Sequence, residues 1–191
     1  VVAVFEPGTF AYLVGAILGD GTVCRHGGTI SIELRVKDRE FAEKVAKAMR
    51  RLTKNHVYFW QDKEGMWRAK MYSKSLGRLL MACKEDLGFL RRLIRGHEVE
   101  FLTGFYEAEG CYHQDRWRHI RIIIVNKRHD LIYLVEDLLR ERGYHPSIYR
   151  HDGGCLRLVI GIREEVERFL RETRPVIKHG ESRGGSGQQR A

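Results

Sequence analysis

Apolar and polar residues alternate along two stretches of the chain that are roughly ninety positions apart, the signature of a long internal repeat. The first stretch covers residues 29–35 and the second covers residues 119–125, with Ile or Leu at every second position. Such alternation is typical of a β-strand that buries one face. Two shorter strand-like runs follow in each half, over residues 56–61 and 66–72 and then over 145–150 and 156–160. Each half therefore predicts four strands.

Segments with helical spacing of apolar residues lie between and after these strand-like runs in both halves. Apolar residues recur at every fourth position after the long strands, and each half closes with a further cluster of apolar residues at helical spacing. The first pair of helices is marked by Phe41, Val45 and Met49, matched by Leu131, Val135 and Leu139. The closing pair is marked by Leu76, Leu79 and Leu80, matched by Val166, Phe169 and Leu170. With one helix before the strands, each half has the order αββαββα.

The helix that opens each half contains small residues spaced four apart. Residues 10–21 read FAYLVGAILGDG, with Gly15 and Gly19, and residues 100–110 read EFLTGFYEAEG, with Gly104 and Ala108. Glycine inside a helix costs about 1 kcal/mol relative to alanine, so its repeated use needs a structural reason. Close approach of the two helices is such a reason, and we expect them to pack against each other.

An acidic residue stands at the end of each of these helices, Asp20 in the first and Glu109 in the second. If the helices pack side by side, the two carboxylates come together, where each raises the pKa of the other. The helix dipole also disfavours an acid at a C-terminus, so finding one in both halves favours a function. A divalent cation removes the repulsion, and Mg²⁺ prefers such oxygen ligands.

The composition of the chain predicts a polyanionic partner. The 191 residues carry a formal net charge of +9 and a pI near 9.6, and 43% of them are hydrophobic. A basic surface of this kind binds a phosphate backbone by releasing its counterions. No apolar run is long enough to span a bilayer. The four cysteines show no metal-binding or disulfide pattern, which favours a reducing, cytoplasmic location.

The two motifs, residues 13–21 and 102–110, resemble the paired signature of the LAGLIDADG homing endonucleases, in particular the compact single-chain archaeal members. The resemblance implies an α+β fold of two pseudo-symmetric αββαββα halves joined through a central two-helix interface. Each half would carry a four-stranded antiparallel sheet, and the two sheets would form a DNA-binding saddle. We expect the first half to cover residues 1–96, the second 97–178, and a disordered Gly/Ser-rich tail 179–191.

The resemblance also implies roles for individual residues at the motif ends. Asp20 and Glu109 would bind the metal, together with the backbone carbonyls of Gly19 and Ala108. Further catalytic candidates are the residues that follow each long strand, which are Lys37, Asn126 and Lys127. They would position water or stabilise charge, although the lysines are equally typical of an exposed helix start. Val36 departs from the polar residue that is usual in the family, so the first half would organise its water differently.

The activity implied is a site-specific double-strand break in a long, partly asymmetric DNA target, leaving short 3′ overhangs. Mg²⁺ would be the cofactor, Mn²⁺ could substitute for it, and Ca²⁺ would bind without supporting cleavage. The enzyme would be intron-encoded, monomeric and cytoplasmic, with double-stranded DNA as its partner.

The strand alternation predicts which side chains face the DNA. Residues opposite the apolar positions point away from the helices, and polar side chains there can read base edges in the major groove. The predicted DNA contacts are Thr29, Ser31, Glu33, Arg35, Arg68, Lys70, Tyr72, His119, Arg121, Tyr149, Arg150 and Arg157.

Other functions fit part of this pattern. An RNA maturase that binds intron RNA would use the same basic surface, and a non-cleaving DNA-binding regulator would use the same scaffold. A basic structural protein with a duplicated fold explains the repeat but not the two acids. Cys24 with His26 and Cys111 with His113 could supply four zinc ligands, but this spacing is unusual for a zinc site.

Overall fold

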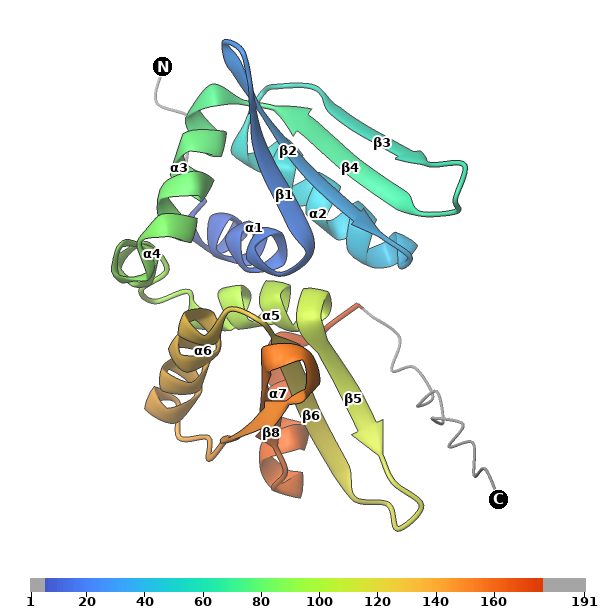
Figure 1. Ribbon diagram of the computed structural model, residues 1–191, viewed down its shortest axis with the longest axis vertical. Coiled ribbons are helices and arrows are strands. Elements are labelled where there is room, and N and C mark those ends of the chain that lie inside the picture. The colour runs from blue at the N-terminus through green and yellow to red at the C-terminus, as the bar shows by residue number, and fades with distance from the viewer. Residues whose placement is uncertain (1–5, 177–191) are drawn as a thin grey trace.

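Two helices that pack tightly against each other hold the halves of the protein together at its centre. They are α1 (Pro7–Asp20) and α5 (Glu98–Glu109) in the computed structural model, which describes residues 6–176. Figure 1 shows the first half, coloured blue to green, on one side of this helix pair and the second half, yellow to red, on the other. Both helices are buried along most of their length, so they form the middle of the hydrophobic core.

The small residues of the two helices make this close approach feasible. A Cβ atom added to Gly15 would lie 2.3 Å from the carbonyl oxygen of Phe101, and one added to Gly104 would lie 2.1 Å from that of Tyr12. Real Cβ atoms essentially never come within 3.0 Å of another heavy atom. The backbones of α1 and α5 are therefore in direct contact, as the glycine spacing predicts.

Each half contributes one four-stranded antiparallel sheet with the same topology. The first sheet has the order β1-β2-β4-β3 and consists of β1 (Gly21–His26), β2 (Thr29–Val36), β3 (Val57–Gln61) and β4 (Trp67–Tyr72). The second has the order β5-β6-β8-β7 and consists of β5 (Gly110–Gln114), β6 (Ile120–Asn126), β7 (Ser147–His151) and β8 (Cys155–Ile160). A short 3₁₀ turn, Asp152–Gly154, joins β7 to β8.

Amphipathic helices cover the inner face of each sheet and leave the outer face open. These helices are α2 (Arg39–Leu52) and α3 (Lys74–Glu85) in the first half, and α6 (His129–Glu141) and α7 (Arg163–Thr173) in the second. Asp38 caps α2 by accepting a hydrogen bond from the backbone N–H of Phe41, and Ser73 caps α3 in the same way through Leu76. The predicted α+β fold of two αββαββα halves is confirmed.

A short helix that the sequence analysis did not predict lies in the crossing segment between the halves. This helix, α4 (Leu87–Leu93), has only seven residues, too few for a helical period to stand out. Its Arg91 contacts Asp137 at 3.4 Å and also pairs with Glu141, both on α6 of the second half. The linker thus adds a contact between the halves outside the central helix pair.

The structure bears on the expected tail and on the expected lack of membrane spans only within the residues that it describes. The proposed tail, residues 179–191, lies outside the described residues. Among residues 6–176, no helix is both long and apolar enough to cross a membrane.

Replacing Gly104 by Ala should destabilise the protein although the same change favours an isolated helix. The new Cβ would force α1 and α5 apart, and overpacking of this kind costs about 1–3 kcal/mol or more. Urea unfolding measures the loss. Gly161→Ala is the matched control, because an added Cβ there meets nothing within 4 Å. Equal stability of the two variants would contradict the direct backbone contact.

Candidate active site at the ends of the helix pair

Asp20 and Glu109 are the last residues of α1 and α5, at the same end of the helix pair. The residues before them are in contact, since a Cβ on Gly19 would lie 2.4 Å from Cβ of Ala108 and 3.0 Å from Cγ of Glu109. The chain turns into β1 and β5 directly after the two acids. One acid from each half is therefore held beside the other by the crossing of the helices.

Burial dominates the electrostatics of the two acids, and their proximity adds to its effect on Glu109. Burial, followed by the negative charge of Asp20, raises the pKa of Glu109 to about 7, although a hydrogen bond from Asn126 acts in the opposite direction. Burial also raises the pKa of Asp20. Raised carboxylate pKa values mean that the pair holds its full negative charge poorly without a compensating cation.

The groups gathered here fit a magnesium ion. Two carboxylates lie at the ends of two helices whose last carbonyl groups lack partners within their own helix, and these groups include those of Gly19 and Ala108. Oxygen ligands of this kind suit Mg²⁺, which keeps several waters and needs only one or two carboxylates. Among residues 6–176 there is no cluster of three or more His, Cys, Asp or Glu arranged around a metal. The two carboxylates therefore fit an ion that keeps waters as most of its other ligands.

Asn126 is the one further catalytic candidate that contacts an acid. It ends β6, its side-chain N–H donates to Oε1 of Glu109 at 2.7 Å, and its carbonyl oxygen accepts from the backbone N–H of Arg128. The second bond fixes the amide, and the first then fixes the carboxylate. Lys37 and Lys127 are exposed, and within residues 6–176 neither makes a hydrogen bond or ion pair with either acid. Val36, in the place of a polar residue, is buried.

Glu107, which the sequence analysis did not single out, is a buried acid two residues before Glu109. Its Oε2 accepts from the hydroxyl of Tyr12 at 2.7 Å, and its Oε1 accepts from Nζ of Lys44 and from the backbone N–H of Val176, both at 2.7 Å. The cluster ties α1, α2, α5 and the segment after α7 together behind the acid pair. An acid within an otherwise apolar helix was the sequence signal for it.

The outer face of the first sheet carries the polar side chains expected there. Glu33 and Arg35 on β2 lie beside Lys70 and Arg68 on β4 by register, and Tyr72 is exposed at the end of β4. Thr29 is partly exposed at the start of β2. Ser31 shares this face but is only 5% exposed, since it is flanked by Cys24 and Tyr72 and its hydroxyl donates to the carbonyl of Cys24.

In the second sheet, three of the five predicted residues lie on the outer face, His119 is exposed just before β6, and Arg150 lies on the other side. Arg121, Tyr149 and Arg157 alternate with the inward apolar residues, and His119 is exposed in the turn before β6, where its Nδ1 lies 2.9 Å from Asp115. Arg150 pairs with the inward Leu156 in the β7–β8 register, so it faces the helix side. The prediction that Arg150 points outward is therefore wrong, because adjacent residues of a strand face opposite sides.

The zinc alternative finds no support in the arrangement of its ligands. Cys24 lies on β1 and Cys111 on β5, which belong to different sheets, and both are exposed as free thiols.

Comparison with known proteins agrees with this architecture. Residues 96–174 match the family described as the LAGLIDADG-like domain. This match covers most of the second half of the chain. Among solved structures, the complex of I-DmoI with DNA and manganese has a TM-score of 0.69 at 23% identity, covering 87% of this chain and 96% of that one. The homing endonuclease I-WcaI, bound to its DNA recognition sequence, has a TM-score of 0.65 at 15% identity over 91% and 84%. The LAGLIDADG fold therefore extends over both halves.

Two further relatives broaden the range of proteins with this fold. The N-terminal LAGLIDADG domain of WhiA has a TM-score of 0.64 at 17% identity, covering 93% of this chain and 87% of that one. The uncharacterized protein MJ0314 of Methanocaldococcus jannaschii is 23% identical over 74% of this chain. The matched region spans 57% of the length of that relative.

Glu109→Gln should stabilise the protein at neutral pH when metal is absent. The raised pKa of Glu109 means that the folded state keeps a proton that the unfolded chain loses, so wild-type stability falls as the pH rises from about 4.5 to about 7. The glutamine has no such loss, and we expect a gain of about 1 kcal/mol above pH 7, reduced for solvent screening. Thermal unfolding in EDTA between about pH 5 and about pH 8 measures it. Glu85→Gln, an exposed glutamate at the end of α3, is the control. If the stabilities of wild type and Glu109→Gln changed with pH in parallel, the raised pKa of Glu109 would be contradicted.

Proposed function

We propose that this protein is a site-specific DNA endonuclease that makes a metal-dependent double-strand break in a long, partly asymmetric duplex. The observation that carries the proposal is the pairing of Asp20 and Glu109 at the ends of two crossing helices, one from each half. Two like charges brought together at unfavourable helix ends cost stability, and a fold that retains both has a use for them. The fold shared with homing endonucleases supports the same reaction.

In the proposed site, the carboxylates of Asp20 and Glu109 and the carbonyls of Gly19 and Ala108 hold Mg²⁺, and Mn²⁺ can replace it. Such an ion lowers the pKa of a bound water and polarises a phosphate oxygen. Asn126 keeps the carboxylate of Glu109 in place through its 2.7 Å hydrogen bond. Lys37 and Lys127 lie at the ends of β2 and β6, where they would stabilise negative charge on the scissile phosphates.

The two sheets would bind the major groove on either side of the acid pair. Their outer faces carry most of the predicted contact residues, and the chain has a net charge of +9 to attract the phosphate backbone. The protein would act as a monomer, because a single chain already contains both halves of the site. Each acid would serve one strand, so both strands would be cut within a few base pairs, leaving short 3′ overhangs.

A second candidate is a DNA-binding regulator that does not cut, since the likeness to the N-terminal LAGLIDADG domain of WhiA shows that the fold is not confined to proteins named as homing endonucleases. Retention of both acids and the raised pKa of Glu109 favour the nuclease. An RNA maturase remains a third use of the same basic surface. Incubating a random duplex library with the protein and Mg²⁺, and sequencing both bound and cleaved molecules, separates these functions. Selective cleavage supports the nuclease, and selective binding without cleavage supports the regulator. Binding of structured RNA but no DNA supports the maturase.

Asp20→Asn and Glu109→Gln should each abolish double-strand cleavage of the selected site. Loss of a metal ligand removes several kcal/mol of transition-state stabilisation, which is a rate decrease of about a thousandfold or more. Affinity for the DNA should be unchanged or higher, since each variant removes a negative charge. Cleavage of a plasmid and fluorescence anisotropy measure the two effects, with Glu85→Gln as the control. Wild-type cleavage rates in either variant would overturn the proposed roles.

A further inference from the structure

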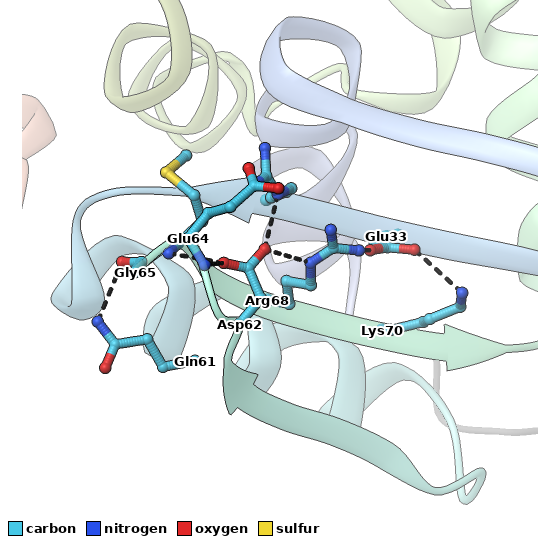
Figure 2. A network of polar contacts seen from close by, with 9 residues as sticks. Glu33, Gln61, Asp62, Glu64, Gly65, Arg68 and Lys70 are labelled. Carbon is cyan, nitrogen blue, oxygen red and sulfur yellow. Dashed lines mark hydrogen bonds and ion pairs between the residues drawn. The ribbon is translucent and has the colours of Figure 1, made fainter.

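The outer face of the first sheet carries a continuous network of ion pairs, shown in Figure 2. Three basic and three acidic side chains from β2, β4 and the β3–β4 turn make it up. We call these residues the Asp62 network: Glu33, Arg35, Asp62, Glu64, Arg68 and Lys70. The charged residues predicted to contact DNA on this face, Glu33, Arg35, Arg68 and Lys70, are thus already held in ion pairs when no DNA is bound.

Asp62 is the centre of the network because it joins two arginines and the turn. Its Oδ2 accepts from Nε of Arg35 and from Nε of Arg68, both at 2.8 Å. Its Oδ1 accepts from the backbone N–H groups of Glu64 and Met66, both at 3.0 Å. The Asp62 side chain is only 12% exposed, and the hydrogen bond from Arg35, more than the one from Arg68, holds its pKa well below the usual range. The turn therefore fixes the carboxylate, and the carboxylate fixes the two guanidinium groups.

The two arginines lie directly opposite each other across the β2–β4 pair. Two guanidinium groups at neighbouring positions repel, so without an acid between them they would spread apart into solvent. Each donates only part of its five N–H groups to the network. Arg35 uses Nε toward Asp62 and Nη2 toward Glu64, while Arg68 uses Nε toward Asp62 and Nη1 toward Glu33. Donors on both guanidinium groups are left for a ligand, and much of the side-chain entropy that binding would cost is already lost.

The charge of this face separates it from the corresponding face of the second half. Three positive and three negative side chains leave the Asp62 network without net charge. In the second sheet, neither Arg121 nor Arg157 contacts a carboxylate anywhere in residues 6–176. A face without net charge gains little DNA affinity from the release of counterions. Arginines without an acidic partner gain affinity in this way from a duplex of any sequence. The neutral face can therefore contribute mainly through the pattern of its donors and acceptors.

We infer that Asp62 is a positioning residue for sequence readout, which holds Arg35 and Arg68 ready to bind guanine in the half-site that faces the first sheet. Guanine offers two acceptors in the major groove, which the fork of an arginine matches. The second half would supply affinity that depends less on sequence. This inference rests on the proposed function, since it takes duplex DNA as the ligand.

Asp62→Asn tests the inference, because the amide keeps one carbonyl oxygen for the turn but offers no second acceptor to the arginines. The probes are the duplex selected by the wild type, each of its single-base-pair variants, and an unrelated duplex of equal length, all in EDTA to prevent cleavage. We expect discrimination to fall about tenfold at one or two adjacent G·C pairs. Binding to the unrelated duplex should strengthen, and its logarithmic salt dependence should steepen by about 0.9, because one negative charge is lost from the face.

Two further variants distinguish an effect of the carboxylate's position from an effect of its charge, and thermal unfolding tests whether each variant folds. Asp62→Glu keeps the charge but displaces the carboxylate, so it should keep the wild-type salt dependence and still lose discrimination. Asp137→Asn, on the exposed side of α6, makes the same charge change away from both sheets and should alter neither property. Thermal unfolding verifies that each variant is folded.

The outcomes distinguish this inference from the proposed function. If the wild type binds its site selectively and Asp62→Asn and Asp62→Glu keep the same base preferences, the role of Asp62 is overturned and the endonuclease proposal stands. If discrimination falls equally at all positions, the network supports the sheet and does not read bases. A wild type with no selective DNA binding would overturn both proposals.

Discussion

The direct contact between the backbones of α1 and α5 is the constraint on which the rest of the structure depends. Gly15 and Gly104 each face a carbonyl oxygen of the other helix, with no room for a Cβ atom. This contact sets the separation of the halves, joins their cores and brings Asp20 next to Glu109. A wider separation would accommodate larger residues but would part the two acids. The glycines therefore lower the intrinsic stability of the two helices but allow the close approach that the site requires.

The acid pair is a source of instability that the surrounding structure offsets. Burial and the charge of Asp20 raise the pKa of Glu109 to about 7, which means that ionising it in the fold is unfavourable. Behind the pair lies Glu107, the other acid of the second motif. Three hydrogen-bond donors, including Lys44, surround its carboxylate and compensate its negative charge. One carboxylate of α5 thus holds the helices together, and the other remains available at the surface for a cation.

The two halves share a fold but differ in the chemistry of their outer faces. In the first, every basic residue of the Asp62 network meets an acid, and Asp62 alone contacts both arginines. In the second, Ile123 is buried on the outer face, where its register neighbours are Cys111 and Val159. Duplication therefore conserves the helix pair and the sheet topology, while the exposed strand positions have diverged. Such divergence suits a ligand whose two ends are not identical.

The sequence by itself determined the repeat, the order of elements and the two acids, because alternation, helical spacing and glycine inside a helix are local consequences of burial and close packing. It did not reveal α4, which is too short to show a period. Alternation along the strand excludes that Tyr149 and Arg150 both face outward, but only the pairing of β7 with β8 decided that Arg150 is the one that faces the helices. It identified Arg35 and Arg68 as isolated outward residues. Only the tertiary structure decided that Asp62, 27 positions from Arg35 along the chain, joins them, since a hydrogen bond between distant residues depends on how the strands come together.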